Sequence, residues 1–84
     1  MRIELFQRVA LARDLPDHGL RIGDVATVVE ELPATEDSGG EVGYALEVFN
    51  AVGETIAVVI VPASAVKPLT EDEVLQARPL RAAS

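Results

Sequence analysis

Residues 14–32 read DLPDHGLRIGDVATVVEEL, and this stretch decides the fold because a loop rich in Pro and Gly runs directly into an alternating segment. Pro16 fixes φ, whereas Gly19 and Gly23 permit positive φ, so residues 14–23 are predicted to form an ordered excursion rather than a plain hairpin turn. Residues 25–32 alternate in the manner of a β-strand, with apolar side chains on both faces. We therefore expect a strand that curves or is covered at one end.

Further segments with the character of strands lie on both sides of this stretch. Each is short and is separated from the next by turn-forming residues. Residues 50–54, NAVGE, supply a tight reversal, so the two segments that flank it are expected to pair. Residues 62–65, PASA, are typical of a single 3₁₀ turn. The expected strands are RVALA at residues 8–12, YALEVFN at 44–50, TIAVVIV at 55–61 and VKPL at 66–69.

The tail differs in pattern from everything before it. Thr70 and Glu73 have the spacing of a helix capping box, and Pro79 prevents a helix from continuing. This predicts a short helix over residues 71–78, which is too short to persist alone and must either dock or fray. The side chains available for docking are Val74, Leu75 and Leu80. We divide the chain into a domain of residues 1–69 and a helical tail of residues 70–84.

Composition limits the size and the compartment of the protein. A chain of 84 residues allows one domain, with a small core built from Val, Ile, Leu and Ala because only three residues are aromatic. The absence of cysteine excludes disulfides, thiolate zinc sites and a cysteine nucleophile, and it fits a reducing cytoplasm. The start, MRIELF, lacks the apolar region of a signal peptide, and the longest apolar run is too short to span a bilayer. We expect a soluble cytoplasmic protein.

The net charge of −7 is unevenly distributed along the chain. No Lys or Arg lies between Arg21 and Lys67, so this midsection carries charge of one sign. Nucleic-acid binding is not expected, because it depends on neutralising phosphates with Lys and Arg. Solubility and a basic protein partner both remain open as reasons for the charge. The carboxylates of the midsection belong to Asp24, Glu30, Glu31, Glu36, Asp37, Glu41, Glu47 and Glu54.

These observations predict an all-β fold, an SH3-like small barrel of about five strands with a short C-terminal helix. DLPDHGLRIGDVATVVE, YALEVFNAVGETIAVVIVPASAVKPL and DEVLQAR resemble a family of short bacterial proteins, domain of unknown function 4926, over about residues 6–80. The resemblance implies a small β-barrel with no established activity. Because members can be encoded beside toxin-like genes, it also raises an inhibitory role, antitoxin-like or immunity-like. One departure is Ala26, where the family's V-G-T-V run has Gly.

A weaker likeness is to the SH3-like part of the nitrile hydratase β-subunit, which also has a Pro and Gly loop before a strand. That part is a scaffold and needs a second subunit with cysteine ligands, which this chain lacks. The likeness implies a structural or accessory domain of an enzyme complex as the alternative function. Fold analogy of this kind does not assign an activity.

Few residues offer chemistry. His18 follows Asp17, but neighbours in a loop rarely present both groups to one substrate atom, so an exposed turn histidine is favoured over catalysis. Residues 36–41 offer oxygen ligands for Ca²⁺, yet their spacing does not match an EF-hand loop, and a solvated loop is favoured. We therefore expect no enzyme activity, no cofactor and no metal site.

Protein–protein contact is the remaining class of function. We expect an acidic partner or inhibitor of another bacterial protein, which would be basic or toxin-like, with a homodimer as a further possibility. The strand TIAVVIV must be central, dimerised or covered by the tail, and a plain core strand is favoured. The expected contact residues are Glu30, Glu31, Glu36, Asp37 and Glu41, with Asp17, His18 and Arg21 as a second surface.

Overall fold

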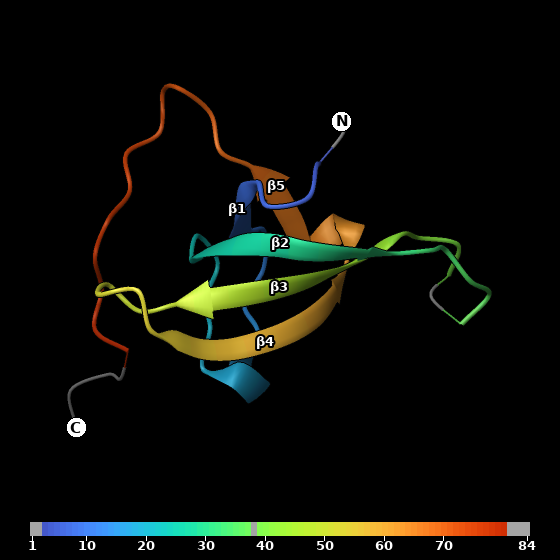
Figure 1. The fold of residues 1–84 in the computed structure, drawn as a ribbon, viewed down its shortest axis with the longest axis horizontal. Helices are drawn as coiled ribbons and strands as arrows, with labels where there is room; N and C mark the ends of the chain where they lie inside the picture. Colours follow the sequence, from blue (N-terminus) through green and yellow to red (C-terminus); the bar gives the residue numbers. More distant parts are fainter. Residues whose placement is uncertain (1–2, 38, 81–84) are drawn as a thin grey trace.

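The computed structural model describes residues 3–37 and 39–80, and it is mainly β (Figure 1). The elements follow the order predicted for residues 8–69, and the predicted strand bounds are confirmed to within about two residues. In chain order they are β1 Arg8–Leu11, the 3₁₀ turn η1 Pro16–His18, β2 Val25–Leu32, β3 Gly43–Phe49, β4 Thr55–Pro62, the 3₁₀ turn η2 Ala63–Ala65 and β5 Val66–Pro68.

The five strands form one antiparallel sheet in the order β4-β3-β2-β1-β5. Figure 1 shows β1 and β5 lying steeply across the direction of β2, β3 and β4, so the sheet is strongly curled. Within the described residues β4 and β5 do not pair with each other, and the sheet is not closed. The all-β class is therefore confirmed, whereas closure into a barrel is not.

The core lies on the concave side of the curled sheet. Val28, Leu46 and Val59 follow one another across β2, β3 and β4 in register, and all three are buried. Val9 and Leu11 of β1 join them, because alternate residues of a strand face the same side. The core therefore consists mainly of aliphatic side chains, and no polar or charged residue is buried in the described part of the chain.

A β-bulge in β2 changes which face its carboxylates occupy. Val28 pairs with Leu46 but Glu30 pairs with Ala45, so Val29 is an extra residue between them. Alternation alone would place Glu30 on the core side with Val28, and the bulge moves it to the outer side. Ala26 lies in a regular part of the ladder, opposite Val9.

The predicted tail helix is wrong. Residues 71–78 contain no helix, although half of the capping box forms: Glu73 Oε1 accepts from the Thr70 N–H, whereas the Glu73 N–H donates to the Thr70 carbonyl oxygen and not to its hydroxyl. A helix this short needs an apolar face packed on the sheet, and Val74, Leu75 and Leu80 are all exposed instead. The tail is held by charged side chains, since Lys67 pairs with Glu73 and Arg78 pairs with Asp24. Residues 81–84 of the predicted tail lie outside the described residues.

Candidate functional site

The outer face of β3 and β4 carries a set of exposed apolar side chains, here called the outer patch. Val58 is 61% exposed and Ile60 is 70% exposed, whereas the intervening Val59 and the following Val61 are 3% and 5% exposed. The strand therefore buries one face and leaves an equally apolar face bare. Its members are Phe49, Ile56, Val58 and Ile60.

Register explains why these four side chains gather. Val58 lies opposite Glu47, and Ile60 lies opposite Ala45. A bulge where Phe49 pairs with Thr55 places Ile56 as the extra residue at the hairpin end. Phe49 lies exposed on the opposite face from the buried Tyr44, because residues at odd spacing in a strand face opposite sides.

The outer patch lies at the edge of the sheet. In the described chain β4 pairs only with β3, so its other side presents backbone N–H and C=O groups that have no partner strand. Figure 1 shows β4 as a long, curved outermost strand. Of the three situations expected for TIAVVIV, two are not found in residues 3–37 and 39–80, where the strand is not central and no tail helix covers it.

Carboxylates border the outer patch, and no cation lies among them in sequence. Glu47 sits beside Val58, and its Oε2 accepts a hydrogen bond of 2.5 Å from the Thr55 hydroxyl. Glu54 accepts from the Asn50 side-chain amide at 2.8 Å within the hairpin. On the neighbouring strand Glu30 is exposed next to Ala45. The contacts of Glu47 and Glu54 are with neutral groups, and neither carboxylate forms a salt bridge within the described residues.

The acidic residues predicted for partner contact do not form one surface. Glu30 and Glu31 lie exposed on β2, whereas Glu36 and Asp37 lie on the connection that extends away from the sheet between β2 and β3 (Figure 1). Glu41 fastens that connection to η2, because its Oε1 accepts from the Ser64 backbone N–H at 2.9 Å. Glu41 therefore has a structural contact in addition to its predicted role.

The second predicted surface surrounds η1. Asp17 and His18 are exposed residues of this 3₁₀ turn, which ends at Gly19 with a φ of 68°. The loop is closed by carboxylates, since Asp14 Oδ1 accepts from Ile22 N–H and Asp24 Oδ2 accepts from Arg21 N–H, both at 2.8 Å. The ordered excursion predicted for residues 14–23 is confirmed.

An ion pair that the sequence did not indicate joins the tail to this loop. Arg78 donates from Nε to Asp24 Oδ1 at 2.8 Å and also reaches the carbonyl oxygen of Gly19 at 3.2 Å. The hydrogen bond from Arg78 holds the pKa of Asp24 below its ordinary value, and the same contact raises the pKa of Arg78. The partners are 54 residues apart, so no local spacing could have indicated the pair.

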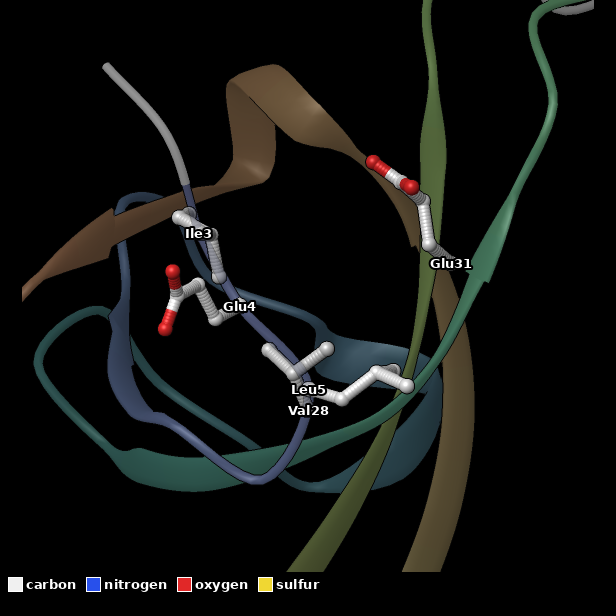
Figure 2. A pocket seen from close by; sticks show the side chains of 5 residues that line it. All are labelled: Ile3, Glu4, Leu5, Val28 and Glu31. Carbon is white, nitrogen blue, oxygen red and sulfur yellow. The ribbon is translucent and has the colours of Figure 1, made fainter.

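A hollow of about 450 Å³ lies where the N-terminal segment crosses β2 (Figure 2). It is lined by Ile3, Glu4, Leu5, Val28 and Glu31. Figure 2 shows the carboxylates of Glu4 and Glu31 at opposite sides of the hollow, so they do not converge on one position.

Comparison with known proteins identifies the family. The model of the family described as Domain of unknown function (DUF4926) matches residues 5–68. This chain belongs to the DUF4926 family. No curated protein and no solved structure matches the chain significantly.

The matched part of this DUF4926 protein holds all five strands and the whole outer patch, whereas the tail follows it. Sequence reasoning singled out TIAVVIV but not its individual outward residues. The sequence shows that Ile56, Val58 and Ile60 occupy alternate positions of the strand. It does not show that they are exposed, because a strand that is apolar on both faces is typical of a central strand.

In residues 3–37 and 39–80 no His, Cys, Asp or Glu side chains gather in threes as a metal would require. Ser38, one member of the Ca²⁺ alternative, lies outside those residues. The same part of the chain has no helix of the length and apolarity needed to cross a membrane.

Proposed function

We propose that this protein is a small, non-catalytic module that binds another protein, and that the partner is basic. The observation that carries the proposal is the outer patch, an apolar face at a sheet edge bordered by carboxylates that form no salt bridge within the described residues. The role is that of an acidic partner or inhibitor in the bacterial cytoplasm. The order of strands and 3₁₀ turns supports the finer assignment of the curled sheet to the SH3-like class.

The outer patch supplies part of the free energy needed for association. Complete burial of one Val or Ile side chain contributes roughly 1.5–3 kcal/mol, and Val58 and Ile60 are still more than half exposed. Association costs on the order of 4–15 kcal/mol in lost freedom. The burial of these two side chains alone does not offset that cost, so backbone pairing and electrostatic attraction must contribute.

Charge supports a basic partner. Residues 22–66 contain no Lys or Arg and include all of β2, β3 and β4. A surface of one sign attracts an oppositely charged protein at long range and accelerates the encounter. The same surface repels nucleic acid, which favours protein over nucleic acid as the partner class.

Affinity capture from a native lysate tests this function. The full chain is immobilised, bound proteins are identified by mass spectrometry, and each candidate is then purified and titrated against the chain. We expect a basic protein that binds with a dissociation constant in the micromolar range or tighter and whose binding weakens with added salt. If the purified candidate is a toxin, its activity should fall on binding.

Other outcomes of the capture contradict parts of the proposal. A metalloenzyme subunit as the reconstituted partner would replace the inhibitor role by the accessory-domain alternative. Binding that is unchanged by salt would remove the electrostatic argument. A complete lack of any protein that binds after purification would overturn the proposed function.

A further inference from the structure

We propose that β4 binds its partner by strand addition, and that the added strand carries both apolar and basic side chains on its outer face, that is, at every second residue. The inference rests on the proposed function and specifies its surface, its geometry and the chemistry of its partner. It uses the open backbone edge of β4 together with the outer patch, and it makes no use of the hollow near Glu31 or of the loop around His18.

The backbone of β4 provides the first half of the site. Thr55–Pro62 is an eight-residue strand paired with β3 from its beginning to its end. Pairing with β3 holds it extended, so a partner strand meets a preformed row of donors and acceptors and orders only itself. Pro62 closes the row at the η2 end, because it has no N–H to donate.

The side chains of β4 provide the second half. Ile56, Val58 and Ile60 project on the outer face beside the position of an added strand, where cross-strand neighbours lie close enough to pack. Apolar residues on the outer face of the added strand would cover them. The other positions on that face of the added strand would lie near Glu47, which is on β3, the next strand beyond β4.

Lys or Arg fits those remaining positions. A long aliphatic stem can lie over Val58 while its charged end reaches the carboxylate of Glu47. At the hairpin end of β4, Glu54 offers a second carboxylate. An added strand that is apolar alone would leave both charges next to its backbone without compensation, whereas a basic and apolar strand satisfies the row and the charge together.

A second copy of this chain is the disfavoured occupant. Its own β4 has matching apolar residues, but it would bring a net charge of −7 to a surface formed by strands β2, β3 and β4, which contain no Lys or Arg. The carboxylates of Glu47 and Glu54 would then approach those of the other copy, and like charges across an interface are destabilising. Charge complementarity therefore favours a foreign strand.

A designed peptide tests the inference on the full chain. The probe, called the Lys and Val peptide, is a capped peptide of the length of β4, eight residues, with Val and Lys in turn at the positions of one face and Thr at the positions of the other. Three controls have the same length. In the first Ser replaces Val, in the second Glu replaces Lys, and the third is the Lys and Val peptide N-methylated at alternate residues. We expect saturable binding of the Lys and Val peptide, and binding at least about tenfold weaker for each control, about 1.4 kcal/mol.

Variants of the chain locate the binding. Val58→Lys places a cation in the outer patch and should weaken the Lys and Val peptide at least about tenfold. Val52→Lys adds the same charge at an exposed hairpin position outside β4 and serves as the matched control. Amide resonances of residues 55–61 should shift on titration of the unchanged chain. Equal loss with both variants, or shifts confined to other residues, would overturn the inference.

The outcomes separate this inference from the function on which it rests. If a captured protein binds Val58→Lys as tightly as the unchanged chain, the module still binds a partner but β4 is not its docking strand. Equal affinity for the N-methylated peptide would refute strand addition. Concentration-dependent dimerisation of the chain alone, abolished by Val58→Lys, would assign the edge to a second copy and overturn the inference.

Discussion

The two edge strands of the sheet are built in opposite ways. β5 has three residues, of which one is Lys67 and one is Pro68, and the tail that follows it is held by ion pairs to Lys67 and Asp24. β4 has eight residues, no charged side chain and a bare apolar outer face. Short length, Lys and Pro are the features by which proteins protect a sheet edge from pairing.

This difference shows that the sheet is protected at one edge and open at the other. Because the chain has protective residues in β5, their absence from β4 does not follow from the overall composition of the chain. An open apolar edge is an aggregation hazard unless something occupies it. The carboxylates around β4 reduce that hazard against a second copy while leaving the edge available to a basic partner.

The largest effect on stability is expected when substitutions on the two faces of β4 are compared. Val59→Ala should lower the free energy of unfolding by about 2 kcal/mol, because it removes buried methyl groups and leaves a cavity in the core. Val58→Ala makes the same chemical change one residue away and should alter it by less than about 0.5 kcal/mol. Urea denaturation of the unchanged chain and of the two variants measures both changes in the free energy of unfolding. Similar losses for the two variants would mean that the outer patch is covered.

The protected edge should show a smaller and pH-dependent effect. Asp24→Asn removes the charge that Arg78 contacts and should cost about 1 kcal/mol near neutral pH, since solvent screens a pair close to the surface. The pKa of Asp24 is lowered in the folded protein. Its contribution is therefore present above the ordinary value of 3.8 and is lost as pH falls through the lower folded pKa.

Denaturation of the unchanged chain and of Asp24→Asn across acid pH checks this sign. The difference between the two proteins should be constant near neutrality and shrink as the pH falls below the ordinary value for Asp. A difference that grows on acidification would contradict the assignment of the Arg78 contact as the cause.

The smallest effect is expected at the second anchor of the tail. Lys67 and Glu73 form an exposed pair, and exposed pairs contribute little to stability. Lys67→Met should therefore leave the denaturation midpoint unchanged within error. A loss as large as that of Asp24→Asn would show that the tail, and not the Arg78 contact alone, stabilises this edge.

Much of the fold could be predicted because its signals are local. The Pro and Gly loop, the alternation of residues 25–32 and the NAVGE reversal each fix a turn or a strand within a few residues. The bulge at Val29 could not be predicted, because inserting one residue into a pairing leaves the composition of the strand unchanged. The tail helix was wrong for a related reason: its capping signal is real, but no surface was available to bury Val74.

The candidate site was less predictable than the fold. The acidic midsection is visible in the sequence, but its members lie on separate surfaces, and Glu41 is occupied by Ser64. Whether TIAVVIV is central or at an edge depends on strand order, which is a property of the whole sheet. The exposure of Val58 and Ile60 follows from that order and from no local pattern.

Amide hydrogen exchange along β4 in the isolated chain tests the open edge most directly. In an antiparallel pair, successive residues point their N–H groups alternately toward the neighbouring strand and away from it. With β3 on one side only, residues 57–61 should alternate between strong protection and rapid exchange. Uniform strong protection at these residues in the monomeric chain would contradict the account, because it would mean that another strand already covers the outer edge.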